Sequence, residues 1–518
     1  MRRSHEWNFA GRLLDRLGEN SALIEAASGE TLRSAEIGEK IAGFATGFLS
    51  SGLRPGDRVL ITCGLNASSA LAYLGAMYAG CVPVLLDERT HAASGDEVVA
   101  KANAKAAWTP KPVRGNWARK NGFPRLEGDF DPCAVSSLQP FSCSKDDLAV
   151  LMPTSGSTGM PRLVMVTHGN LIANTEAIIR SHHLAADEKA MLIMPVSYCF
   201  GASVMHTHLY QGGAVVFDSR FMFPDKVLRA INTYGCTTFA GVPTVYHMLL
   251  RRSHLGSMAL PSLRRLLQAG GALAPESIAE LRKLVPHADI HVMYGQTEAT
   301  ARISSLSAEA LSEKLGSVGR PLDNLTIRIV DDQGRTIANG HTGEIQVSGP
   351  SVCVGYLDEP EATRSKFDRD GLKTGDLGCV DEDGYLWIKG RSSDFIKIRG
   401  YRVSLNEVEA KVSAIAGVRE CAATGVPHPE AGEAVALFVV PEDHVPEDHF
   451  PEDRVSEDGV QEAGVQEAGA HDLVENNLVE RVRRALPAQW TCASVKVVAE
   501  LPRTANGKIA RSQLPAFA

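Results

Sequence analysis

Short apolar runs alternate with longer amphipathic stretches over the first part of the chain. Residues 58–61 and 81–86 are two such runs, and the Ala- and Leu-rich stretch 69–80 between them has the composition of a helix. Strands that alternate with helices indicate a parallel sheet with crossover helices. We therefore expect an α/β sheet within residues 1–145.

The same alternation returns further along the chain. Apolar runs predict five more strands, at 190–194, 214–217, 237–240, 265–268 and 290–293. They are separated by stretches long enough for crossover helices. We expect a second α/β sheet here.

The pattern changes after residue 320. Short strands with Gly/Asp turns at 331–334 and 381–384 favour an antiparallel or barrel-like piece between 320 and 400. The last part, about 392–518, predicts a small α+β unit. Its expected elements are a helix at 406–415, a strand at 434–440, a helix at 473–486 and a strand at 495–498.

One segment has neither pattern. Residues 441–471 form a five-residue repeat of the type PEDHV, which contains ten acidic residues and one Arg. Such a composition does not bury enough apolar surface to offset its ordering entropy. We expect the repeat to be disordered, and we expect its deletion to leave the chemistry of the chain intact.

Composition changes this picture in one respect. The 518 residues carry a formal net charge of −8, which argues against a chain that coats nucleic acid or an anionic membrane. The repeat alone contributes −9, however, so the remaining residues sum to +1. The prediction that no nucleic acid is bound therefore rests on the absence of a nucleic-acid-binding motif.

The location of the protein is predicted from what the sequence lacks. The basic start, Arg2-Arg3, is not followed by an apolar run, and no uninterrupted apolar stretch of about 18 residues occurs. The ten cysteines include no C-x-x-C pair, so free thiols are favoured over a disulfide or zinc framework. We expect a cytoplasmic protein without a membrane span.

The most informative stretch is residues 153–162, PTSGSTGMPR. Small residues allow a backbone to approach a ligand closely, and hydroxyls with a following cation suit phosphate oxygens. The stretch also follows an apolar strand, 148–152, but it is not a P-loop, because no G-x-x-x-x-G-K-[ST] occurs. The candidate phosphate-binding residues are Thr154, Ser155, Gly156, Ser157, Thr158, Gly159 and Arg162.

This loop, with VTHGN at 166–170, resembles the adenylate-forming superfamily of acyl-CoA synthetases, adenylation domains and luciferases. Further matching motifs follow in order: MYGQTEAT at 293–300, GEI at 343–345, GY at 355–356, TGDL at 374–377, GR at 390–391, IKIRGYR at 396–402 and LPRTANGK at 501–508. Their shared order makes the resemblance specific over nearly the whole chain.

The resemblance implies a fold and a division into domains. A large N-terminal domain, 1–391, would hold two αβαβα-type sheet subdomains and a small β-barrel-like subdomain. A hinge at 392–393 would join it to a small, mobile α+β domain, 394–518, which would rotate between the two halves of the reaction.

The reaction implied is AMP-forming acid–thiol ligation. A small carboxylic acid attacks Mg²⁺-bound ATP to give an acyl-adenylate and pyrophosphate, and a thiol then displaces AMP. The thiol would belong to CoA or to the phosphopantetheine arm of an acyl or peptidyl carrier protein. The cofactors implied are thus ATP, Mg²⁺ and CoA or phosphopantetheine.

The resemblance also assigns roles to residues. Glu298 would hold Mg²⁺, Thr297 would contact the α-phosphate, and Lys508 would stabilise charge that develops during adenylation. Tyr294 would stack on adenine opposite Gly270, Gly271 and Ala272, with Gly295 beside it. Asp376 and Arg391 would bind the ribose. The hinge and thiol side would include Ser393, Lys397, Gly400 and Tyr401.

The acid pocket is expected to be mostly apolar, lined by Tyr198, Phe239, Gly241, Val242 and Ala269. No Asp occurs in 194–201, where amino-acid adenylation domains place one, and a buried ammonium without a counter-charge is costly. A fatty or aromatic acid is therefore favoured. Two departures from the family pattern, Leu163 and Ser393, are expected to alter rates and not the chemistry.

Three functions remain open at this stage. The first is an acid–CoA ligase, and the second is a stand-alone enzyme that loads a separate carrier protein. The third is a nucleotide-binding pseudoenzyme, which the presence of Glu298, Asp376 and Lys508 disfavours.

Overall fold

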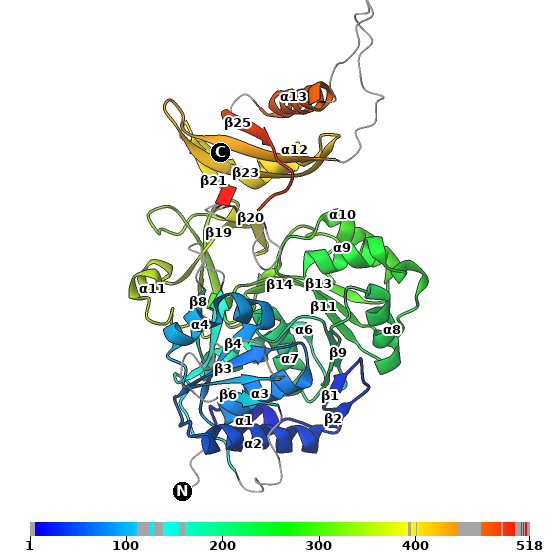
Figure 1. Cartoon of the computed structure of the whole chain (residues 1–518), viewed down its shortest axis with the longest axis vertical. Coiled ribbons are helices and arrows are strands. Elements are labelled where there is room, and N and C mark those ends of the chain that lie inside the picture. Colours follow the sequence, from blue (N-terminus) through cyan, green and yellow to red (C-terminus); the bar gives the residue numbers. More distant parts are fainter. Residues whose placement is uncertain are drawn as a thin grey trace, which may run out of the picture. The chain divides into compact units, whose positions relative to one another are not determined.

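The computed structural model describes residues 6–110, 125–128, 138–154, 161–391, 395–399, 401–442, 468–487, 490–502, 509, 511 and 513–514. The chain divides into two compact units. The first unit comprises Met1–Thr374 and Gly378–Lys389, and the second comprises Gly375–Leu377 and Gly390–Ala518. Figure 1 shows their elements.

The first sheet has six strands in the order β6-β5-β3-β4-β7-β8. Neighbouring strands are parallel except β7 and β8, which form an antiparallel pair. The predicted strands at 58–61, 81–86 and 148–152 are confirmed. The bounds are β3 Arg58–Cys63, β4 Val82–Asp87, β5 Ala106–Thr109, β6 Arg125–Glu127, β7 Leu148–Thr154 and β8 Arg162–Thr167.

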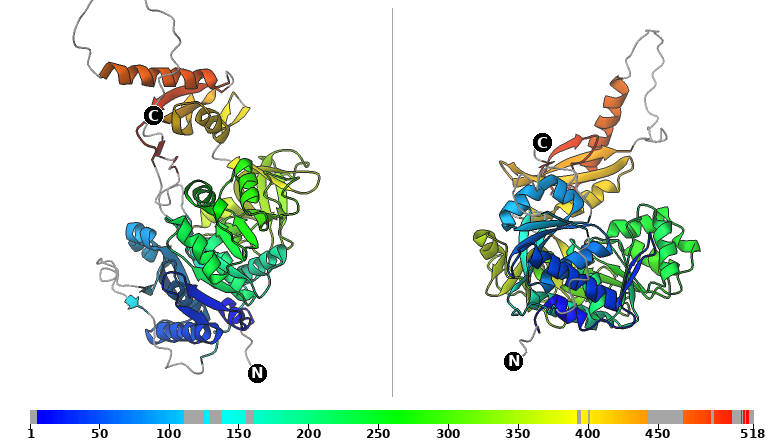
Figure 2. Two further views of the ribbon diagram at one scale, coloured as in Figure 1. Left: turned by 90° about the vertical axis from the view of Figure 1, so that its right-hand side faces the viewer. Right: turned by 60° about the horizontal axis from the view of Figure 1, so that its bottom comes forward.

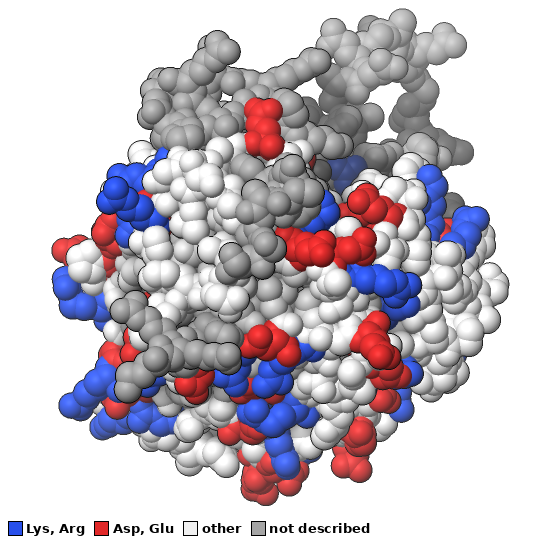
Figure 3. Space-filling model, turned by 90° about the horizontal axis from the view of Figure 1, so that it is seen from below, with Lys and Arg blue, Asp and Glu red and all other residues white. Residues whose placement is uncertain are grey.

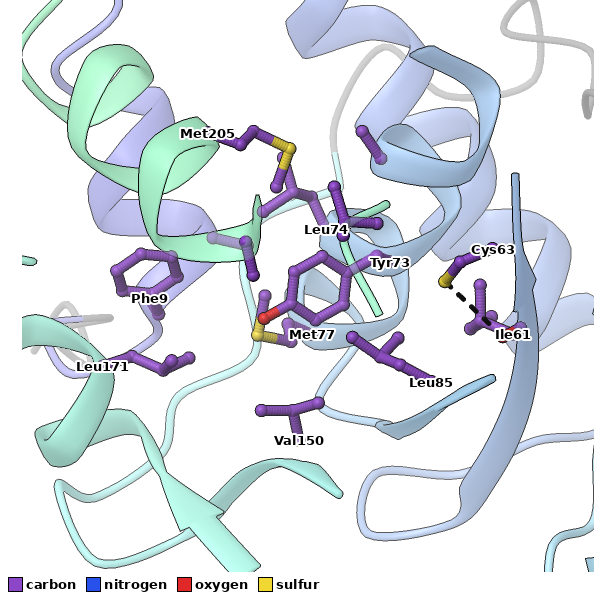
Figure 4. Packing of buried hydrophobic residues seen from close by; sticks show 14 of the residues in the cluster. Phe9, Ile61, Cys63, Tyr73, Leu74, Met77, Leu85, Val150, Leu171 and Met205 are labelled. Atoms are coloured by element: carbon purple, nitrogen blue, oxygen red, sulfur yellow. Dashed lines mark hydrogen bonds between the residues drawn. The ribbon is translucent and has the colours of Figure 1, made fainter. Parts of the chain in front are cut away.

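Alternation along the strands places helices on both faces of this sheet. Val59 and Leu85 pack in one core cluster with α3 (Ala67–Tyr78), whereas Leu60 and Val84 pack in another with α4 (Glu88–Ala102). Eleven of the twelve residues of α3 are buried, which confirms the predicted helix at 69–80 as a core helix. Figure 4 shows its Tyr73 among Phe9, Leu85 and Val150.

The second sheet has nine strands in the order β15-β14-β13-β12-β11-β9-β10-β1-β2. The five strands predicted between 190 and 300 are confirmed, and they form its parallel centre. The bounds are β1 Ala22–Glu25, β2 Thr31–Arg33, β9 Lys189–Leu192, β10 Ala214–Phe217, β11 Thr238–Gly241, β12 Arg265–Gln268, β13 Asp289–Tyr294, β14 Ser304–Leu306 and β15 Arg320–Pro321.

The two sheets share one helical layer. Helix α7 packs with α3 in the core cluster that includes Leu192 and Val215, whereas Met191 and Val216 face the other cluster, formed with α8, α9 and α10. This layering is the expected αβαβα arrangement, and it can be followed in Figures 1 and 2. The helices are α1 Phe9–Leu14, α2 Ser34–Ser50, α6 His168–His182, α7 Cys199–Tyr210, α8 Pro224–Tyr234, α9 Pro243–Arg252 and α10 Pro275–Leu284.

An antiparallel sheet follows, as the turns at 331–334 and 381–384 predict. Its order is β16-β17-β19-β18, and β20 pairs with β19. The bounds are β16 Thr326–Val330, β17 Gly343–Ser348, α11 Pro360–Lys366, β18 Phe367–Asp368, β19 Gly371–Val380 and β20 Leu386–Arg391.

The second unit has the predicted α+β composition. Its sheet has the order β22-β21-β24-β23, with β25 beside β24. Residues 443–467 of the acidic repeat lie outside the described residues, and the repeat's two ends belong to β24 and α13. The bounds are β21 Phe395–Ile398, β22 Tyr401–Ser404, α12 Leu405–Ser413, β23 Val418–His428, β24 Gly432–Pro441, α13 Ala468–Ala485 and β25 Cys492–Val497.

The surface of the first unit mixes both signs of charge. On the face seen in Figure 3, Lys and Arg side chains are interspersed with Asp and Glu. Within the described residues, no helix is both long and apolar enough to cross a membrane. The mixed α/β architecture with a large and a small unit agrees with the predicted fold class.

Candidate active site

The predicted phosphate loop connects two paired strands. Thr154 is the last residue of β7, Arg162 is the first residue of β8, and the two are opposite each other in the antiparallel ladder. The intervening candidates Ser155, Gly156, Ser157, Thr158 and Gly159 lie outside the described residues. Their contact with phosphate therefore stays a prediction.

Arg162 is held in place by two neighbours. Its Nε donates to Glu359 Oε2 at 3.1 Å, and its guanidinium carbon lies 5.4 Å from the ring centroid of Tyr356. Lys101 Nζ also pairs with Glu359. Two cations thus share one carboxylate, which leaves a net positive charge beside the strand pair and suits a phosphate.

The turn after β13 positions Glu298 and Thr297. A Cβ on Gly295 would lie 1.8 Å from the carbonyl oxygen of Ala301. The two backbone segments therefore approach each other so closely that only glycine, which has no side chain, fits at this position. Residues 297–299 form a 3₁₀ turn, and Thr300 follows with φ of 67°. The Thr300 hydroxyl donates to the Ser351 carbonyl at 2.7 Å, which anchors the turn.

Glu298 is oriented through its side chain and its backbone. The hydroxyl of Tyr356 donates to Glu298 Oε1 at 2.7 Å, and the backbone N–H of Cys353 donates to the Glu298 carbonyl at 2.9 Å. Burial and the nearby Glu298 carboxylate raise the pKa of Tyr356, so its hydroxyl stays protonated and able to donate. Tyr356 therefore links Glu298 to Arg162.

Thr297 faces the start of helix α7. Its hydroxyl lies 3.5 Å from the Sγ of Cys199, the first residue of that helix. Burial raises the pKa of the Cys199 thiol, which is therefore neutral. Thr297, the predicted contact to the α-phosphate, thus lies beside the chain segment that carries Tyr198, a predicted residue of the acid pocket.

The glycines predicted as the wall of the adenine slot follow β12. Gly270 has φ of +82°, and a Cβ there would lie 2.6 Å from the hydroxyl of Tyr198. The Gln268 side-chain amide donates to the Gly271 carbonyl at 2.7 Å. Because β12 and β13 are parallel neighbours, residues 270–272 and Tyr294 leave the sheet at the same edge.

The predicted acid-pocket residues divide between the two faces of the sheet. Ala269 belongs to the core cluster of α7, and Val242 packs against both clusters. Gly241 ends β11, where a Cβ would meet the Val245 side chain at 2.6 Å. Phe239 instead packs edge-on against Tyr246 in the cluster of α8–α10, so we leave it out of the proposed pocket.

The predicted ribose contacts belong to the second unit and lie close together. Arg391 Nε is 3.4 Å from Asp376 Oδ1, and the two residues come from the paired strands β19 and β20. The Asp376 side chain is only 11% exposed, whereas Arg391 is 69% exposed. A largely buried carboxylate beside an exposed cation is an arrangement that suits two ribose hydroxyls.

The residues predicted for the hinge and thiol side are described only in part. Lys397 and Tyr401 lie on the paired strands β21 and β22, and Arg399 between them has φ of 50°. Ser393, Gly400 and the predicted catalytic Lys508 lie outside the described residues. Their roles stay predictions.

Sequence reasoning missed four residues of this region. Tyr356 belongs to the GY motif and Cys199 to the stretch 194–201, but neither motif assigns them a role, and Glu359 and Arg302 belong to none of the motifs. Only Arg302 carried a signal, since it is a charged residue between the apolar Ala301 and Ile303. The contacts of the others join segments far apart in the sequence.

Comparisons with known proteins identify the family of the chain. The model of the AMP-binding enzyme family matches residues 14–357, and that of the AMP-binding enzyme C-terminal domain matches 407–508. A feruloyl-CoA synthase from an Amycolatopsis species is 36% identical over 424 residues, which cover 80% of this chain and 84% of that one.

Two further similarities extend the comparison. A sulfoacetate–CoA ligase from Cupriavidus necator is 30% identical over 437 residues, which cover 81% of this chain and 84% of that one. The crystal structure of ATP-bound MatB from Rhodopseudomonas palustris superposes with a TM-score of 0.82 at 26% identity, over 99% of this chain and 98% of that one. The CoA ligases among these relatives support activation of an acid with ATP and its transfer to CoA. The chain belongs to the AMP-binding enzyme family, which is the adenylate-forming superfamily that its motifs resemble.

Proposed function

We propose that this chain is an AMP-forming acid–CoA ligase. It joins a carboxylic acid to ATP with release of pyrophosphate, and it passes the acyl group from the adenylate to the thiol of CoA with release of AMP. The observation that carries the proposal is the linkage of Glu298 to Arg162 through Tyr356, beside the strand pair β7–β8. This linkage joins a carboxylate suited to a cation with a cation suited to phosphate.

The described residues fit Mg²⁺ and ATP. Mg²⁺ in nucleotide enzymes takes one or two carboxylates and completes its shell with phosphates and water. Glu298 is such a carboxylate, and the described part of the chain contains no group of three or more His, Cys, Asp or Glu placed to hold a metal by themselves. When bound there, Mg²⁺ would neutralise charge on the phosphates.

The chain's own residues position the nucleotide. Residues 270–272 and Tyr294 would enclose adenine, Asp376 with Arg391 would bind the ribose, and Thr154 with Arg162 would contact the terminal phosphates. Thr297 would donate to the α-phosphate. Positioning and charge neutralisation supply most of the rate in reactions at phosphorus, so these contacts are the main catalytic device.

The acid would lie on the side of Tyr198, Val242 and Ala269. Ala240 and Met293 of the same core cluster extend an apolar wall, which suits a fatty or aromatic acid. Lys508 would stabilise the charge that develops during adenylation, which is the role that the family resemblance implies for it. The free thiols of the described cysteines fit a reducing cytoplasm.

ATP–pyrophosphate exchange over a panel of carboxylic acids tests the proposal. Acid-dependent exchange is expected, and Lys508→Ala should reduce it by about 100-fold or more, because a group that stabilises transition-state charge is lost. Lys411→Ala, which removes an exposed lysine on α12, is the matched control and should retain exchange.

Exchange without any acid, or exchange unaffected by Lys508→Ala, would contradict the proposal. A second stage adds either CoA or a phosphopantetheinylated carrier protein and measures thioester by mass. If thioester formed on the carrier protein and none formed on CoA, the carrier protein and not CoA would be the acceptor of the acyl group.

A further inference from the structure

Arg302 is a buried cation without a counter-charge among the described residues. It is 3% exposed, it forms no ion pair there, and its Nε has no hydrogen-bond partner. Its other contacts are neutral: one terminal nitrogen meets the sulfur of Met293, and the guanidinium carbon lies 5.0 Å from the ring centroid of Phe200.

The groups closest to Arg302 in electrostatic terms do not supply a negative charge. They are Cys199 and Tyr198, and burial raises the pKa of both, that of Tyr198 to about 12. The pKa of Arg302 itself is lowered by burial to about 10, so the guanidinium remains charged at neutral pH.

Another arginine of the same unit, Arg265, has a side chain that is 13% exposed and is treated differently. Arg265 is paired with Glu188, a carboxylate whose side chain is 2% exposed. Because an unpaired buried charge is costly, such pairing is the rule. We therefore expect the guanidinium of Arg302 to pair with an anionic group that is not among the described residues.

Arg302 is held at its backbone and along its side chain. Asn174 donates to the Arg302 carbonyl at 2.9 Å and accepts from its N–H at 3.2 Å. The guanidinium itself packs against Met293 and Phe200, and such pre-positioning of a charged group favours selective recognition of a ligand.

The position of Arg302 is on the acid side of the site. Its contacts Phe200 and Met293 belong to the core cluster that contains Ala240 and Ala269, and Tyr198 of the same segment lies against Gly270. Thr297, the predicted contact to the α-phosphate, touches Cys199, whereas Arg302 touches the next residue, Phe200. A ligand group reaching Arg302 would be the part of the acid remote from the nucleotide.

We infer that Arg302 determines specificity by binding a second anionic group of the substrate, so that the acid is one with an apolar body and a carboxylate or sulfonate at its far end. This inference rests on the proposed function, because it assigns the acid of that reaction. It narrows the fatty or aromatic class to its dianionic members. A neutral end in this place would leave the guanidinium unpaired in the complex.

Matched acids that differ only at the far end test the inference in the full-length protein. The pairs are hexanoate with adipate and cinnamate with 4-carboxycinnamate, and 6-sulfohexanoate separates sulfonate from carboxylate. We expect kcat/KM for acid-dependent exchange to favour the dianion in each pair by about 100-fold or more, since a site built for a polar group rejects its absence strongly.

Variants give the second readout. Arg302→Met should abolish the preference for dianions, because it lowers kcat/KM for the dianionic acids and leaves kcat/KM for the acids with a neutral end unchanged. Arg302→Lys should retain part of the preference. Arg320→Met, an exposed arginine on β15, is the control and should leave the ratio unchanged. A thermal-shift titration with adipate and hexanoate, each in the presence of ATP, should show stabilisation by adipate that Arg302→Met removes.

The outcomes separate this inference from the proposed function. Equal use of both members of each pair by the unaltered protein would overturn the inference and leave acid–CoA ligation standing, and this result needs no variant to fold. An equal loss on both members in Arg302→Met would also overturn it, because that pattern means a role at the reacting carboxylate or in the structure. Absence of exchange with every acid would overturn the proposed function, and the inference with it.

Discussion

Glu298 and Arg302 are four residues apart on one short stretch of chain, and the protein treats their charges in opposite ways. Glu298 is partly exposed, and Tyr356 orients its carboxylate. Arg302 is almost fully buried and has only neutral neighbours among the described residues. The difference suggests two kinds of ligand. The hydrogen-bonded carboxylate of Glu298 is positioned for Mg²⁺, which many nucleotide enzymes bind, whereas the guanidinium of Arg302, which lacks a counter-charge among the described residues, is proposed to bind the anionic end of one class of acid.

The largest expected effect comes from Gly295, which fixes both charges at once. In Gly295→Ala the new Cβ would have to displace the Ala301 carbonyl, 1.8 Å away, so the turn that carries Glu298 and Arg302 would shift. We expect a loss of about 3 kcal/mol in the free energy of unfolding, as for other overpacked sites. Urea denaturation followed by circular dichroism measures it.

Gly38→Ala is the control for this substitution. Gly38 lies inside helix α2, and a Cβ there meets nothing within 4 Å, so alanine should raise stability by about 1 kcal/mol. If Gly295→Ala matched Gly38→Ala in stability and kept full exchange activity, the tight turn would not be what positions the two charges.

Arg302→Met is expected to have the next largest effect, and of the opposite sign. Removal of an unpaired buried guanidinium relieves its desolvation cost, so the unliganded protein should gain about 1–3 kcal/mol. The midpoint of urea denaturation without acid measures this gain.

Arg265→Met is the informative counterpart, because it removes one of the two arginines that pair with the buried Glu188 and leaves only Arg264 as its cation. It should destabilise the protein by about 2 kcal/mol. A loss of stability in Arg302→Met as large as that in Arg265→Met would mean that Arg302 has a structural partner, and the contrast between the two arginines would be lost.

The smallest effect is expected for Tyr356→Phe, which tests the support of Glu298. Loss of the 2.7 Å hydrogen bond should cost about 1 kcal/mol of stability and should raise the Mg²⁺ concentration needed for half-maximal exchange a few-fold, since the carboxylate is no longer oriented. A magnesium titration of the exchange rate measures the second effect.

Tyr246→Phe removes a comparable buried hydrogen bond, 2.9 Å to the Leu267 carbonyl, far from Glu298 in the contact network. It should lower stability to a similar degree without moving the magnesium titration. Equal shifts in both variants would show that Tyr356 acts through packing alone.

Much of the fold could be predicted from the sequence, because its strands are short apolar runs with clear turns between them. Residues 58–61 and 214–217 became strands within two residues of the predicted bounds. Strand β1 could not be assigned to its sheet, since nothing local to Ala22 shows that it pairs with Ala214. Parallel pairing over such distances is decided by tertiary packing.

The candidate site divides in the same way. Glu298 and Arg162 could be predicted because they belong to ordered motifs, whereas the tie between them through Tyr356 depends on chain segments that only the fold brings together. Phe239 shows the limit of reasoning from position alone. One step along β11 exchanges the two faces of a strand, and Phe239 packs among α8–α10 while Ala240 faces α7.

The placement of β1 has a consequence for synthesis of the chain. Strand β1 leaves the ribosome early, but its parallel partner β10 begins only at Ala214. At about 5–20 residues per second, the wait is on the order of ten to forty seconds. The six-stranded sheet, complete at Thr167, can assemble within that interval, while the hairpin of β1 and β2 keeps an open edge. Strand β1 is thus paired on its β2 side alone until β10 has been made, and its other edge can mispair during that interval.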